Sequence, residues 1–86
     1  MNASAQENGL PALLRGALPD AETAERIYLV KNVPSLRATQ QIRLLTAKAA
    51  LSKKRLILLT PAACRLDEQL LELMREQPAI ISREDL

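Results

Sequence analysis

Few residues in this sequence are suited to chemistry, and the most suggestive pair is Glu68 and Glu72. Carboxylates one helical turn apart can share acid–base work when a pocket surrounds them. Nothing in the neighbouring residues predicts such a pocket, so we interpret the pair as part of a solvated helix surface. Glu76 continues the spacing, and Arg65 and Arg75 offset part of the repulsion. The functional alternative is an acidic stripe that complements a basic partner.

Cys64 is the single cysteine, and the sequence contains no histidine. Without a second cysteine, no intramolecular disulfide and no thiolate zinc site can form. Without histidine, the commonest general base and the commonest transition-metal ligand are missing. We therefore interpret Cys64 as a half-buried structural residue. The sequence predicts a non-enzymatic protein with no catalytic residue, no metal and no cofactor.

Two loops are the places where a small anion could bind. Ser35 and Thr60 each follow an expected strand and are suited to cap a helix, whose first N–H groups attract anions. Ligands of open parallel sheets bind beyond the carboxyl ends of the strands. Neither loop is rich in glycine, however, and no G-x-G-x-x-G or Walker sequence occurs. We therefore interpret both residues as helix caps only.

The charge distribution is the most informative feature of the sequence. Residues 26–65 hold nine basic residues and no acidic one. Residues 1–25 hold one basic and four acidic residues, and residues 66–86 hold two basic and six acidic residues. Such segregation favours electrostatic contact with a partner or with a second copy of the chain.

One helical face within the basic segment carries our predicted contact. On an expected helix over residues 35–52, a second apolar stripe rimmed by cations lies away from the core face formed around Ile42 and Leu45. The alternative is a plain solvated basic face with incidental leucines. We predict partner binding, by a homo-oligomer or another protein, through five residues: Arg37, Arg43, Leu44, Lys48 and Leu51.

Nucleic acid is the second choice of partner. A basic segment supplies phosphate contacts, and Arg37 and Arg43 could enter a major groove. Tyr28 is the only aromatic residue, so a base-stacking platform is excluded, and the acidic flanks would repel a phosphate backbone. No run of 18 apolar residues and no secretory leader pattern occurs, so we expect a cytoplasmic protein without membrane contact.

The elements that position these residues alternate between strand and helix. We expect residues 1–8 to be a flexible tail and residues 9–86 to be one α/β domain. Pro11 and Gly16 bound a short apolar helix, and Asp20 is suited to cap a helical turn through Glu25. Apolar runs predict strands at 27–30, 56–59 and 79–82, and periodicity predicts helices over 35–52 and 60–77.

The expected fold is a small three-stranded, mainly parallel sheet with β-α-β-α-β order, like a fragment of a Rossmann or flavodoxin fold. Two strand orders remain open. The order 1-2-3 places both long helices on one face, and the order 2-1-3 places them on opposite faces. Residues 10–18 could cover an exposed sheet face within a monomer; a dimer or a larger partner could cover it equally well.

Overall fold

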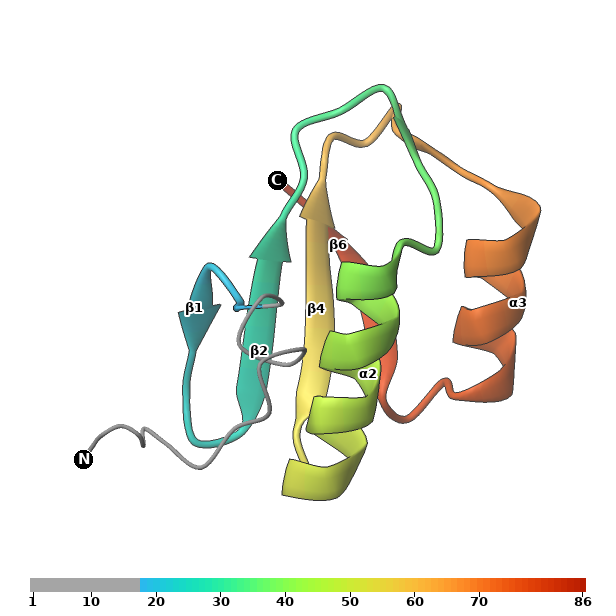
Figure 1. The fold of residues 1–86 in the computed structure, drawn as a ribbon. Coiled ribbons are helices and arrows are strands. Elements are labelled where there is room, and N and C mark those ends of the chain that lie inside the picture. The colour runs from blue at the N-terminus through green and yellow to red at the C-terminus, as the bar shows by residue number, and fades with distance from the viewer. Residues whose placement is uncertain (1–17) are drawn as a thin grey trace.

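The structure is a computed structural model, and it describes residues 18–86 of the chain. The expected tail over 1–8, the domain start at residue 9 and the short helix near Pro11 lie outside the described residues. The elements follow in the order β1 (Ala21–Glu22), β2 (Arg26–Val30), β3 (Ser35–Leu36), α2 (Gln40–Ser52), β4 (Arg55–Thr60), β5 (Arg65–Leu66), α3 (Glu68–Glu76) and β6 (Ile81–Asp85) (Figure 1).

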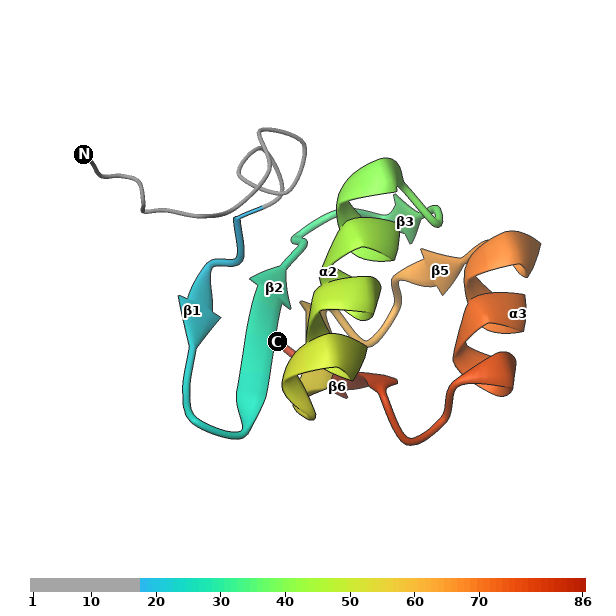
Figure 2. The same ribbon diagram turned by 60° about the horizontal axis from the view of Figure 1, so that its bottom comes forward.

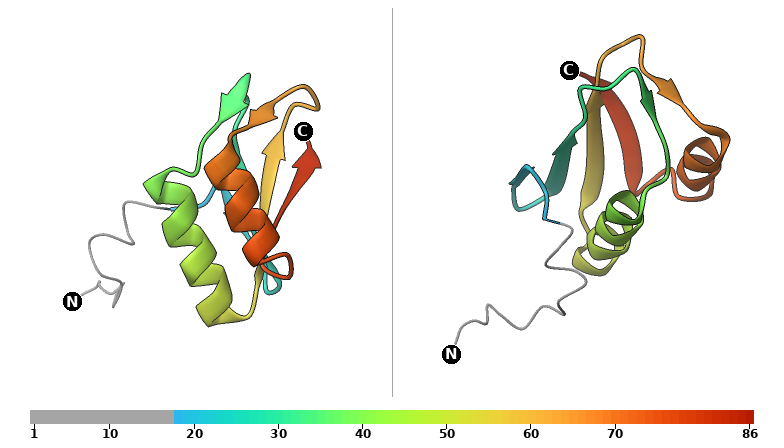
Figure 3. Two further views of the ribbon diagram at one scale, coloured as in Figure 1. Left: turned by 90° about the vertical axis from the view of Figure 1, so that its right-hand side faces the viewer. Right: turned by 45° about the horizontal axis from the view of Figure 1, so that its top comes forward.

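The main sheet has four strands in the order β1-β2-β4-β6. Strands β2, β4 and β6 are parallel neighbours, as expected, and β1 adds an antiparallel edge strand that the sequence analysis missed. Both long helices lie on one face of this sheet (Figures 1 and 3). When successive parallel strands are neighbours in the sheet, the right-handed crossover helices that connect them lie on the same face of the sheet. The order 1-2-3 is therefore correct, and the order 2-1-3 is excluded.

The core lies between the sheet and the two helices. Ile27, Leu29, Leu56, Leu58 and Ile81 project from the strands toward the helices and are buried. The remaining buried members of this cluster come from β3 and from the two helices: Leu36, Ile42, Leu45, Ala49, Leu70 and Leu73. The core is thus aliphatic, as a sequence with one tyrosine and no phenylalanine or tryptophan requires.

Helix α2 begins later than the sequence analysis predicts. Thr39, rather than Ser35, is the N-cap, and its side chain accepts a hydrogen bond from the N–H of Ile42. Ser35 lies in β3, because its backbone pairs with Arg65 of β5. The helix ends at Lys53, which adopts a left-handed conformation with φ 59°. Glycine adopts that conformation without a steric clash, whereas the Cβ atom of Lys53 makes it strained at the end of the helix.

Helix α3 also begins later than predicted. Asp67, rather than Thr60, is the N-cap, and its carboxylate accepts from the N–H of Leu70 at 2.9 Å. Thr60 is the last residue of β4, where its backbone is in register with Asp85 of β6. The prediction failed because Thr60 and Pro61 satisfy the local capping preference, whereas the sheet pairing that holds Thr60 is non-local.

A second, two-stranded sheet joins the two loops at the carboxyl ends of β2 and β4. Strands β3 and β5 pair in parallel, with Ser35 opposite Arg65 and Leu36 opposite Leu66 (Figure 2). Leu36 is buried and Leu66 is half-buried against the core. This pairing fixes the segments that lead into both helices.

Two further predictions about the edges of the sheet were wrong. Asp20 caps no helical turn; its carboxylate accepts from the N–H of Val30 at 2.7 Å, and Ala21–Glu22 forms β1. The third strand is β6 at Ile81–Asp85, so Arg83 and Glu84 are strand residues rather than a polar tail. Arg83 lies on the helix side of this edge strand, where it is partly buried through hydrogen bonds to Thr60 and Pro61.

Candidate interaction surface

The sheet has one face that the described helices leave uncovered. We call it the helix-free face. Because side chains alternate along a strand, the residues between the core positions point away from α2 and α3. They form two cross-strand rows: Tyr28, Ile57 and Ser82 in one, and Val30, Leu59 and Glu84 in the next. Ala21 of β1 flanks the first row, and Arg26 and Arg55 lie at the strand starts.

The centre of the helix-free face is apolar and only partly protected. Ile57 is 2% exposed, although it is not part of the core cluster beneath the helices. Tyr28 and Leu59 are half-buried, and Val30 is 39% exposed. Parallel strands normally have layers on both faces, so an apolar strand surface that residues 18–86 leave without a second layer is unusual.

Long polar side chains border this apolar centre. Arg26 donates to the hydroxyl of Tyr28 at 3.5 Å, and Glu84 lies at the opposite end of the strands. The hydrogen bond to Tyr28, followed by weaker attraction to Glu84 and Glu25, raises the pKa of Arg26. Arg55 donates to the carbonyl of Ala79 at 3.2 Å. The face therefore has an apolar centre between a basic end and an acidic residue.

The two leucines of the predicted contact surface differ in their surroundings. Leu51 is 84% exposed near the end of α2. Leu44 is half-buried and contacts the core cluster. They share a side of the helix, but only Leu51 is free to anchor a partner in this state. Partner binding through these leucines stays a prediction.

The three cations of that surface have different partners. Lys48 forms an ion pair with Glu22 of β1 at 3.0 Å, and Lys54 pairs with the same carboxylate at 2.6 Å. Hydrogen bonds from Lys54 and then Lys48 lower the pKa of Glu22, against the opposing effect of burial. Arg43 donates to the carbonyl of Ala38. Arg37 is exposed beside a groove.

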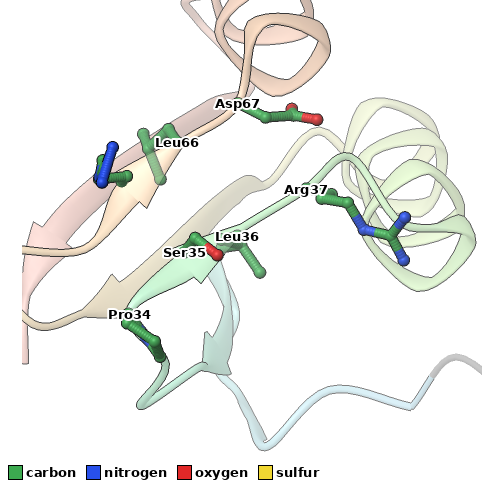
Figure 4. Close-up of a pocket in the computed structure, with 7 residues that line it drawn as sticks. Pro34, Ser35, Leu36, Arg37, Leu66 and Asp67 are labelled. Carbon is green, nitrogen blue, oxygen red and sulfur yellow. The ribbon is translucent and has the colours of Figure 1, made fainter.

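That groove lies at the carboxyl end of the sheet, over the β3–β5 pair (Figure 4). Its volume is about 580 Å³. Arg37 and Asp67, which follow the two strands, extend to the same side in Figure 4. Asp67 is committed to capping α3. The groove thus holds the Asp67 carboxylate as well as arginines, and because a carboxylate repels an anion, the groove is poorly suited to bind one.

The structure gives a structural role to Thr60, which begins one of the two loops considered above for anion binding. The guanidinium of Arg83 donates to the Thr60 hydroxyl at 2.6 Å, to the Thr60 carbonyl at 3.1 Å and to the Pro61 carbonyl at 2.8 Å. It also pairs with Asp85 at 2.7 Å. Arg83 therefore fills the place beyond β4 where a ligand would bind.

The acidic and thiol groups are arranged as a surface and a loop. Arg75 pairs with Glu72 at 2.8 Å and with Glu68 at 3.4 Å, and these hydrogen bonds raise the pKa of Arg75. Cys64 is half-buried in the loop before β5 rather than in a helix. Within residues 18–86, no three histidine, cysteine or acidic residues gather as metal ligands would.

Comparison with family models, with curated proteins and with solved structures found no match to this chain. None of the helices in the described part of the chain has the length and apolar character needed to cross a membrane. The candidate site consequently rests on geometry, and its principal residues are Tyr28, Val30 and Leu59. The sequence analysis missed them because the strand order decides whether the two long helices leave their side of the sheet uncovered.

Proposed function

We propose that this chain is a non-enzymatic assembly module that self-associates through the helix-free face. The observation that carries the proposal is the position of both described helices on the same face of a sheet whose main strands are parallel (Figure 3). Such strands are stable when both faces are covered. A second copy supplies the missing layer for Val30, Leu59 and Tyr28.

The charge at the two ends of the face supports a two-fold arrangement. Arg26 and Arg55 lie where the strands begin, and Glu84 lies where β6 ends. When two copies stack with their strands antiparallel, the basic end of each faces the acidic end of the other. The face is small, so we expect the association to be weak and reversible. Nucleic acid binding is less well supported, because Glu22 neutralises two cations of the basic segment.

The oligomeric state of the purified chain tests the proposal. Sedimentation equilibrium over a concentration series, at low and high salt, should show a dimer that persists at high salt. Val30→Asp should abolish it, since a carboxylate in an apolar contact is costly to desolvate. Leu51→Asp is the matched control: it places the same charge on an exposed leucine of α2, and the dimer should survive.

Three outcomes would overturn the proposal. One is dissociation by Leu51→Asp with no effect of Val30→Asp, which would assign association to the face of α2. Another is a dimer that Val30→Asp leaves unchanged. The third is a monomer at every concentration tested. Far-UV circular dichroism establishes that each variant keeps its fold.

A further inference from the structure

Strand β1 is held at the edge of the sheet by polar contacts rather than by buried apolar side chains. It lies beside β2, at the edge remote from α3 (Figures 1 and 2). Ala21 and Glu22 are both exposed, and no side chain over residues 18–25 is buried. The Asp20 carboxylate, in place of a main-chain carbonyl, accepts from the N–H of Val30 at 2.7 Å. A segment that buries no apolar side chain opens more readily than the rest of its domain.

Strand β1 covers the outer edge of β2. The Asp20 N–H donates to the Tyr28 carbonyl at 2.9 Å, so the main-chain groups of Tyr28 and Val30 face β1. The alternate residues of β2 face β4 instead, as the bond from the Lys31 N–H to the Leu59 carbonyl shows. Strand β2 therefore stays paired with β4 when β1 leaves, and its outer main-chain groups become free to pair with another strand.

Two lysines define the chemistry of this edge. The ammonium groups of Lys48 and Lys54 converge on the Glu22 carboxylate at 3.0 and 2.6 Å, and their side chains are only 23% and 18% exposed. Without that carboxylate the two cations repel each other and lose a charged hydrogen-bond acceptor. A strand that replaced β1 would therefore need a carboxylate at the position of Glu22. On the opposite face Ala21 lies across from Tyr28, so a small residue fits there.

We propose that β1 is a removable edge strand, and that the edge of β2 beneath it binds an extended acidic segment of a partner protein in antiparallel orientation. The main-chain groups of β2 supply the hydrogen bonds, and Lys48 and Lys54 select a segment with a carboxylate opposite Ile27. Strand β1 pairs with only two of the five residues of β2, so a longer partner strand gains main-chain bonds that β1 does not make. Because β1 is tethered, it competes at a high effective concentration and keeps the edge closed until such a segment arrives. The edge is separate from the helix-free face, so this binding does not depend on the proposed self-association.

Hydrogen exchange in the wild-type chain tests whether β1 opens by itself. The amide of Val30 faces β1, whereas the amide of Leu29 lies in the β2–β4 ladder, so neighbouring amides of one strand report on its two sides. After correction for intrinsic rates, we expect Val30 to exchange at least about tenfold faster than Leu29. Low concentrations of urea should hardly change the Val30 rate, because opening β1 exposes little surface. Exchange of Val30 that is no faster than that of Leu29, with the same urea dependence, would show that β1 opens only when the whole domain unfolds, and would overturn the proposal.

Peptide titration followed by NMR of the backbone amides tests the partner. The probe is the synthetic peptide Thr-Val-Thr-Ala-Glu-Thr, which keeps the Ala-Glu-Thr sequence of residues 21–23 and places β-forming residues before it. In Glu22→Lys, a third ammonium repels β1 from Lys48 and Lys54. This variant should therefore bind the peptide at least about tenfold more tightly than the wild type does, with shifts at the amides of Tyr28 and Val30.

Glu25→Lys is the matched control, because it makes the same charge change next to β1, and within residues 18–86 its carboxylate forms no ion pair with either lysine. It should bind the peptide no better than the wild type does, and the same peptide with lysine in place of glutamate should bind none of the three proteins. Equal binding of the two peptides, no gain in Glu22→Lys, or an equal gain in Glu25→Lys would overturn the proposal. Self-association of Glu22→Lys in place of peptide binding would assign the edge to a second copy instead. If Glu22→Lys does not fold, Glu22→Gln replaces it, with a gain of about threefold expected because it removes the pairs without adding a charge.

Discussion

Removing the guanidinium of Arg83 should destabilise the fold, because its hydrogen bonds tie the end of β4 to the edge strand β6. The side chain is 22% exposed and makes three hydrogen bonds to Thr60 and Pro61. A hydrogen bond from a charged donor contributes about 1.5–3 kcal/mol when buried, and partial exposure reduces this to about 1 kcal/mol each. The Thr60 hydroxyl and carbonyl keep other partners, so Arg83→Met should cost about 2–3 kcal/mol in total.

Urea unfolding followed by far-UV circular dichroism measures this cost. For a domain of this size the slope is about 1 kcal/mol per molar urea, so the midpoint should fall by about 2–3 M. Arg83→Lys should recover only part of the loss, because one ammonium cannot reproduce a planar fork that serves several acceptors. Asp85→Asn is the control, since it removes only the ion pair to a carboxylate that is 69% exposed, worth about 0–1 kcal/mol. A midpoint for Arg83→Met close to that of wild type, or equal to that of Asp85→Asn, would refute the reasoning.

Two smaller effects follow from other contacts. Because the pKa of Glu22 is lowered, its pairs with Lys48 and Lys54 stabilise the fold above the ordinary pKa of 4.5 and lose their effect as the pH falls through the lower folded-state value. Glu22→Gln should therefore cost about 1 kcal/mol at neutral pH. The urea midpoints of the two proteins should converge in acid, and a difference that stays constant with pH would contradict this origin. Lys53→Gly should stabilise the fold by about 0.5–1 kcal/mol and raise the melting temperature by a few degrees, because glycine adopts the left-handed conformation at the end of α2 without a Cβ clash. The control is Ser52→Gly, one residue earlier in helical geometry, which should lower the melting temperature. A rise in that variant would show that backbone conformation is not the cause.

The parallel core was predictable from local patterns. Ile27–Val30 and Leu56–Leu59 are continuous apolar runs of strand length, and the helical periodicity through Ile42 and Leu45 identifies the covering helix. Such patterns record which side chains are buried, and the fold requires those side chains to be apolar. The right-handed crossover rule then supplied the connection between strands.

The helix starts were not predictable, because local and non-local preferences compete there. Ser35 and Thr60 both satisfy the capping rule, yet each is held in extended backbone by a partner strand: Ser35 by Arg65, and Thr60 by Asp85. Local capping contributes about 1 kcal/mol, and here the non-local strand pairing of Ser35 and Thr60, together with the burial of Thr60, outweighs it. Arg83 is likewise predicted as a tail residue from the sequence, because its acceptors on Thr60 and Pro61 are more than 20 residues away along the chain.

The candidate site was out of reach for a related reason. Val30 and Leu59 alternate with core residues along their strands. Whether the two long helices leave their side of the sheet uncovered depends on the strand order, and both orders fit the sequence equally well. The predicted surface on α2 met a different difficulty. Glu22 lies 26 residues before Lys48, so the ion pair that occupies this lysine follows only from the position of β1.

The place of Tyr28 gives this protein a built-in optical probe. It is the only aromatic residue in the sequence, and it lies on the helix-free face with its hydroxyl beside Arg26. Its near-ultraviolet dichroism and its fluorescence therefore come from one position, free of overlapping signals from a core chromophore. Whatever covers that face, whether a segment of the same chain or a second copy, dehydrates the ring and becomes visible without a label. Events on the outer side of α2 leave the signal unchanged, so the absorbance of a single side chain distinguishes the two surfaces.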